Sequence, residues 1–105
     1  MAVLDAGDRA TVITGQSTGY PMRCLENKLT REFLAKEKAE ISMEELMEFG
    51  VGKVRLGLIE GDLEWGTLLV GQICGLIDDI RPVKSIIDSI VTEAETIISQ
   101  FCSSK

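Results

Sequence analysis

The chain has 105 residues and a formal net charge of −6. This length allows one domain at most and excludes a complete TIM barrel, which needs about 250 residues. The acidic balance argues against nucleic acids and anionic membrane surfaces as partners, because both require basic patches. Histidine is absent and the three cysteines form no Cys-x-x-Cys pair, so no zinc site, redox motif or histidine general base is expected.

No segment is long and apolar enough to span a bilayer. The longest apolar run covers residues 68–77 and includes Gly71, Gln72 and Gly75. The first four residues are followed by Asp5 and Asp8, which is unlike a secretory leader. We therefore expect a cytoplasmic protein without a membrane partner.

The N-terminal third begins with one β-branched run and a loop. Residues 11–14 read as a short strand that ends at Gly15, and no convincing partner strand follows. We therefore expect this strand to pair outside the chain or to be irregular. In the loop that follows, Ser17-Thr18-Gly19 could cradle a phosphate with backbone amides, but an ordinary turn is the favoured interpretation.

Helices are predicted from there on. The first covers residues 27–38, with Asn27 as its N-cap. The second covers residues 43–60. Ser42 and Glu45 form a capping box at its start, and Gly50 and Gly52 break or kink it.

Two more helices are predicted at residues 67–80 and 82–101. The first is apolar nearly all round, so we expect it to be buried. The second has apolar residues at helical spacings of three and four: Val83, Ile86, Ile87, Ile90, Val91, Ala94, Ile97, Ile98 and Phe101. The predicted fold class is mainly α, as one helical segment over residues 1–105 with at most one short strand.

The apolar run contains the main candidate site. Gln72 is a lone amide between Gly71 and Gly75, and glycines weaken a helix, so another group is expected to approach this backbone closely. From the residues alone, helix packing with Gln72 bonded to a backbone carbonyl is the favoured alternative. Asp62 and Glu64 could be an acid–base pair, but helix capping is the favoured reading of both.

Several short motifs occur in a fixed order along the chain. They are Thr11-Val12-Ile13-Thr14-Gly15, Asn27-Lys28-Leu29-Thr30, Gly61-Asp62, Gly66-Thr67, Gly71-Gln72 and Pro82-Val83-Lys84. Together they resemble the C-terminal segment of the FMN-dependent nitronate monooxygenases (2-nitropropane dioxygenases) and the type II enoyl-acyl-carrier-protein reductases. The resemblance covers roughly residues 3–98.

The resemblance implies that the chain is the helical C-terminal part of a TIM-barrel flavoenzyme. FMN would be the cofactor of the complete enzyme, and Gly71 and Gln72 would lie against the flavin ring. The phosphate site and the catalytic histidine would lie upstream of Met1, so no catalytic or metal-binding residue is assigned in this chain. Gln16 and Tyr20 stand where the reductases usually have arginine and histidine.

Two functions follow as hypotheses. In the first, the chain covers the flavin and shapes the substrate pocket of an FMN-dependent oxidoreductase, and its partner is the missing barrel portion of the same enzyme. Alone, it would be inactive, bind FMN weakly and self-associate through exposed apolar surface. In the second, it is a free-standing acidic helical module that binds a protein through the isoleucine-rich face of its last helix.

Overall fold

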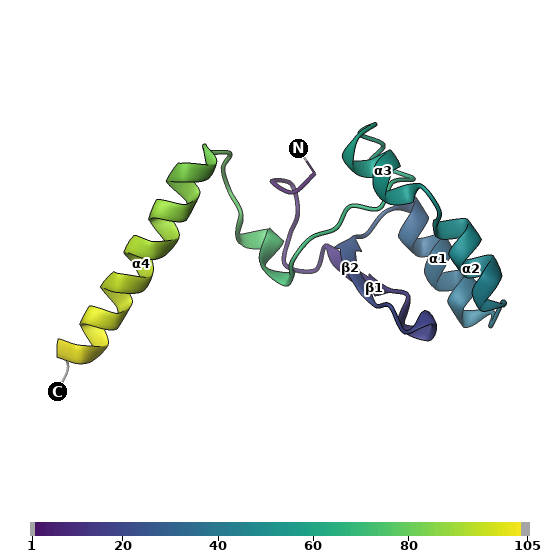
Figure 1. Cartoon of the computed structure of the whole chain (residues 1–105), viewed down its shortest axis with the longest axis horizontal. Helices are drawn as coiled ribbons and strands as arrows, with labels where there is room; N and C mark the ends of the chain where they lie inside the picture. The colour runs from purple at the N-terminus through teal and green to yellow at the C-terminus, as the bar shows by residue number, and fades with distance from the viewer. Residues whose placement is uncertain (1, 104–105) are drawn as a thin grey trace.

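The computed structural model describes residues 2–103, and about half of the chain is helical. Its elements, in chain order, are β1 (Thr11–Thr14), the 3-10 helix η1 (Gln16–Thr18), β2 (Met22–Leu25), α1 (Lys28–Lys38), α2 (Met43–Gly50), α3 (Lys53–Leu58), the 3-10 helix η2 (Gln72–Leu76) and α4 (Val83–Ser103). The hairpin and α1–α3 gather at one end of the molecule, and α4 projects from the other end (Figure 1).

The strand at residues 11–14 has a partner inside the chain, so the expectation of a lone strand was wrong. β1 and β2 pair antiparallel, with Thr11 opposite Leu25 and Thr14 opposite Met22. The four residues of β2 show no alternation of apolar and polar side chains, and that is why the sequence pattern did not reveal them. Among the described residues the sheet has two strands.

Local capping explains the starts of two of the three helices beside the hairpin, α1 and α2. The Asn27 side chain accepts a hydrogen bond from the Thr30 amide, and Ser42 does the same for Glu45. Residues 43–60, where Gly50 and Gly52 were expected to break or kink the helix, form two helices: α2 ends at Gly50 and α3 begins at Lys53. Gly52 joins them with φ 75°, a conformation that favours glycine.

The predicted helix over residues 67–80 is not formed. Only η2 is helical there, over five residues, and the chain on either side of it is extended or irregular. Hydrogen bonds to β2 decide this: the Leu25 amide donates to Leu68 O (3.0 Å), and the Val70 amide donates to Arg23 O (3.2 Å). Residues 68–70 therefore lie along the edge of the hairpin, with a bridge between Cys24 and Leu69.

The chain divides into two regions of different compactness. We call residues 10–69 the lobe and residues 70–103 the arm. The buried apolar residues Cys24, Leu25, Leu29 and Leu46 all lie in the lobe, and Cys74 is the buried apolar residue of the arm. No described residue of α4 is buried, although the helix extends for 21 residues.

The overall dimensions show how open this arrangement is. The radius of gyration is 17.9 Å, whereas a compact domain of this length has about 13 Å. The accessible surface is 7851 Å², against roughly 5,800 Å² for a folded monomer of this mass. The excess surface indicates that the arm does not pack against the lobe as part of one core.

Candidate functional site

Gly71 and Gln72 lie in the segment that connects the lobe to α4. Both are exposed, and a Cβ added at Gly71 would meet no atom within 4 Å. The Gln72 side chain makes no hydrogen bond among residues 2–103. The alternative of tight packing with Gln72 bonded to a backbone carbonyl is therefore not what the structure contains. Instead, an open glycine and a free amide lie side by side.

A hollow next to Gln72 is formed where two parts of the chain cross. It is lined by Asp8, Gln72, Ile73, Gly75 and Leu76. At the crossing, a Cβ on Gly75 would lie 2.8 Å from the carbonyl oxygen of Gly7, so only glycine fits there. The sequence analysis missed Asp8. Its place in the hollow depends on the contact of Gly7 and Asp8 with Gly75, which lies 67 residues beyond Asp8, and such a contact is visible only in the folded chain.

Asn27 fixes the loop that leads to this segment. Its side-chain amide donates to the carbonyl oxygens of Leu63 (3.0 Å) and Gly66 (2.8 Å), while its Oδ1 accepts from the Thr30 amide (3.0 Å). The sequence predicted the cap but not the two long-range bonds. Asn27 therefore joins the start of α1 to the turn that precedes the extended segment.

A contact between two glycines brings the same turn against α3. A Cβ on Gly66 would lie 2.3 Å from the Gly57 Cα, and a Cβ on Gly57 would lie 2.6 Å from the Thr67 carbonyl oxygen. Real Cβ atoms do not approach other atoms so closely, so both positions require glycine. The turn, and with it the course of residues 68–72, is thus set by the lobe.

The two carboxylates considered as an acid–base pair have structural partners. Asp62 accepts hydrogen bonds from the amides of Glu64 (2.9 Å) and Trp65 (2.8 Å), which closes a turn rather than capping a helix. Glu64 forms an ion pair with Lys28 at 2.8 Å. Neither carboxylate is free in the structure. Trp65 is half-buried beside this turn.

The loop after β1 binds an anion from its own chain. The amides of Gly15 and Ser17 and the Ser17 hydroxyl all donate to the Glu37 carboxylate, at 3.1, 3.1 and 2.6 Å. Partial burial acts to raise the pKa of Glu37, but these three hydrogen bonds together hold it below its ordinary value. The Ser17 amide is thus taken by Glu37, and the Thr18 and Gly19 amides donate to the carbonyl oxygens of Gly15 and Gln16, so residues 17–19 form an ordinary turn. Gln16 and Tyr20 are exposed on the same loop.

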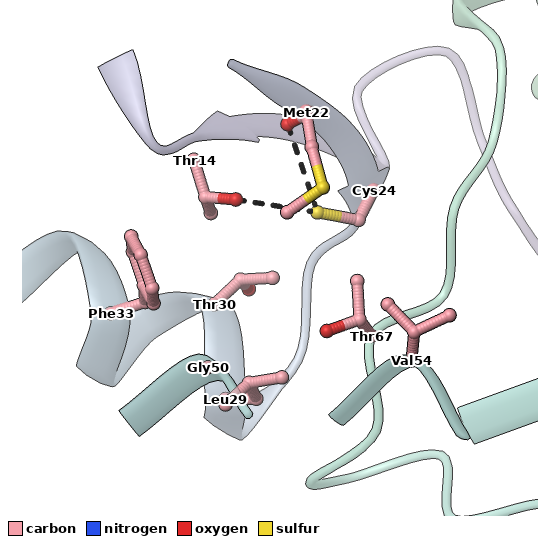
Figure 2. A pocket seen from close by; sticks show the side chains of 9 residues that line it. All are labelled: Thr14, Met22, Cys24, Leu29, Thr30, Phe33, Gly50, Val54 and Thr67. Atoms are coloured by element: carbon pink, nitrogen blue, oxygen red, sulfur yellow. Dashed lines mark hydrogen bonds between the residues drawn. The ribbon is translucent and has the colours of Figure 1, made fainter. Parts of the chain in front are cut away.

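A cavity of about 50 Å³ lies beneath the hairpin (Figure 2). Cys24 lies at its wall with its thiol 3.8 Å from the Thr14 hydroxyl, and the rest is mostly apolar: Met22, Leu29, Phe33, Gly50 and Val54, with Thr30 and Thr67. Burial raises the pKa of the Cys24 thiol by more than the hydrogen bond with Thr14 lowers it. Without a base or a charged group in this lining, the cavity is a gap in the lobe's core.

No helix among residues 2–103 is long and apolar enough to cross a membrane. No group of three or more potential metal ligands comes together within residues 2–103.

Known proteins resemble this chain along most of its length. The family model described as nitronate monooxygenase matches residues 1–93. FabK from Thermotoga maritima superposes with a TM-score of 0.88 and 36% identity, over 99% of this chain and 33% of that one. A point mutant of the same FabK gives a TM-score of 0.76 and 34% identity, over 98% and 30% of the two chains.

Two curated relatives match shorter stretches. The (3aS,4S,5R,7aS)-5-hydroxy-7a-methyl-1-oxo-octahydro-1H-indene-4-carboxyl-CoA dehydrogenase of Mycobacterium tuberculosis is 42% identical over 43 residues, which is 41% of this chain and 12% of the relative. The enzyme of the same name from Rhodococcus jostii is 44% identical over 41 residues, or 39% and 12% of the two chains. The chain thus spans about a third of FabK and about an eighth of these dehydrogenases. The resemblance drawn from the motifs is confirmed, and the chain belongs to the nitronate monooxygenase family of flavin-dependent oxidoreductases.

Proposed function

We propose that this chain is the C-terminal part of an FMN-dependent oxidoreductase of the nitronate monooxygenase or enoyl-acyl-carrier-protein reductase type, and that residues 70–76 cover the flavin and shape the substrate pocket. When bound, FMN supplies the electron transfer. The single observation that carries the proposal is the open Gly71 beside the unbonded Gln72. A glycine lets a planar ring approach the backbone, and a free amide offers hydrogen bonds to its polar edge.

The donor set of this segment suits the ring of FMN and not its phosphate. No lysine or arginine lines the hollow, and the loop amides of Gly15 and Ser17 are taken by Glu37. The phosphate would therefore be held by another part of the enzyme. This agrees with the expectation that the isolated chain binds FMN weakly and is inactive.

The partner in this proposal is the barrel portion of the same enzyme. α4 exposes an apolar face, on which Ile90 is 63% and Phe101 75% accessible. Large exposed apolar patches mark interfaces. In the separate chain the same face would drive self-association. The free-standing module would require a chain that closes its own core, and the excess surface argues against that.

The test is to join this chain to the first two thirds of FabK from Thermotoga maritima, replacing the part that the chain matches. We expect the purified fusion to retain FMN and the separate chain to lack it. Gln72→Leu should weaken FMN binding in the fusion, whereas Gln16→Leu, at an exposed glutamine of the lobe, should not. Stoichiometric flavin on the separate chain, or equal binding by both variants, would contradict the proposal.

A further inference from the structure

We propose that Asp8 is a second flavin-contacting residue, whose carboxylate accepts a hydrogen bond from a ring N–H of the flavin that lies on Gly71 and Gln72. This inference rests on the proposed function and adds a residue to it. It begins with the crossing, where the Cβ position of Gly75 is 2.8 Å from Gly7 O and 3.2 Å from the Asp8 amide nitrogen. Because of this contact, Asp8, which precedes the lobe, and residues 72–76, which follow it, line one hollow of about 290 Å³.

Asp8 is the acidic residue among those that line the hollow, and its carboxylate has no structural task in the described part of the chain. It is exposed, and no hydrogen bond or ion pair involves its side chain among residues 2–103. Asp62 closes a turn, and Glu64 is paired with Lys28. A carboxylate that stabilises nothing in the chain is available to a ligand.

The charge of the hollow decides which end of FMN it accepts. A phosphate would be repelled by Asp8, and no basic side chain lines the hollow to offset this. The other walls are the apolar side chains of Ile73 and Leu76, which are 67% and 80% exposed. An apolar wall with polar groups at one edge suits a planar heterocycle, not a phosphate.

The two polar side chains complement the polar edge of the flavin ring. That edge presents one N–H between two carbonyl groups. A carboxylate can only accept, so Asp8 is suited to the N–H, while the Gln72 amide can donate to a neighbouring carbonyl. Hydrogen bonds that involve an ionised group are the stronger kind, so Asp8 should contribute measurably to FMN affinity.

The experiment uses the fusion described above and measures FMN dissociation constants and flavin absorption spectra. Asp8→Asn keeps the size of the side chain but removes its charge, and should weaken FMN binding by about tenfold and shift the flavin absorption bands. The control is Glu44→Gln, the same carboxylate-to-amide change at an exposed position of α2, which should change neither. Gly75→Ala, which forces the crossing apart, should weaken FMN binding at least as much as Asp8→Asn.

The outcomes separate the two proposals. If Gln72→Leu weakens FMN binding while Asp8→Asn leaves affinity and spectrum unchanged, the role of Asp8 is refuted and the proposed function stands. If the unmodified fusion folds but retains no flavin, the proposed function fails and the role of Asp8 fails with it. A loss of affinity in Asp8→Asn without one in Glu44→Gln supports the inference.

Discussion

The lobe and the arm differ in where their contacts come from. The lobe closes around its own residues: the rings of Phe33 and Phe49 pack in a tilted arrangement with centroids 6.1 Å apart, and Leu46 is 2% exposed. The arm has an equally clear apolar pattern, yet no described residue of α4 is buried. An amphipathic pattern thus shows that a surface is built for burial, but it does not show that the partner lies in the same chain.

The lobe should be sensitive to any atom added at the Gly57–Gly66 contact. Gly66→Ala would place a Cβ 2.3 Å from the Gly57 Cα, so we expect the lobe to lose about 3–5 kcal/mol of stability. The same change at Gly71, where an added Cβ meets nothing, should alter stability by less than about 1 kcal/mol. Urea unfolding followed by Trp65 fluorescence measures the stability of both variants. Equal losses of stability in the Gly66→Ala and Gly71→Ala variants would contradict the close contact of Gly66 with Gly57.

Asn27 should matter through its long-range bonds more than through its cap. Asn27→Asp keeps the acceptor for the Thr30 amide but removes both donors and sets a carboxylate against the carbonyls of Leu63 and Gly66. We expect a loss of about 2–3 kcal/mol. Ser42→Ala removes a cap that lacks such bonds and should cost about 1 kcal/mol. The same urea titration applies, and a smaller loss in Asn27→Asp than in Ser42→Ala would contradict this account.

The lobe should also respond to acid through Glu37. Because the folded-state pKa is lowered, the ionised carboxylate stabilises the lobe above its unfolded pKa, near 4.5, and this stabilisation is lost as the pH falls through the folded pKa. Glu37→Gln should cost about 1 kcal/mol at neutral pH and flatten the decline of stability in acid. Unfolding curves between pH 7 and 3 provide the comparison, with Glu40→Gln as the control. An unchanged pH dependence in Glu37→Gln would contradict the stabilising role of the hydrogen bonds from Gly15 and Ser17 to Glu37.

Local interactions explain what the sequence predicted and long-range ones explain what it missed. The caps at Asn27 and Ser42 and the break at Gly50 and Gly52 depend on neighbours within a few residues. The failed helix over residues 67–80 depends on β2, whose backbone groups bond to Leu68 and Val70 and keep that segment extended. An apolar run of this length fits either a buried helix or an extended segment, so its periodicity could not decide.

The residues of the candidate site also fall into those that the local sequence reveals and those that only a long-range contact reveals. Gly71 and Gln72 were found because two glycines beside one amide are unusual in an apolar run, and their role in flavin binding stays a prediction. Asp8 could not be found, since nothing near it in the sequence marks it. It reaches the hollow only through the crossing of Gly7 and Gly75, far apart in the chain.

The central claim is that the arm is built to be covered by something other than the lobe. Sedimentation of the separate chain at several concentrations tests it most directly, with Ile90→Glu/Ile97→Glu as the variant, because both residues lie on the exposed face of α4. We predict that the average mass of the unmodified chain rises with concentration. The variant should stay monomeric, with urea unfolding of the lobe unchanged. A clean monomer of the unmodified chain at high concentration, with one cooperative transition that includes α4, would contradict the claim.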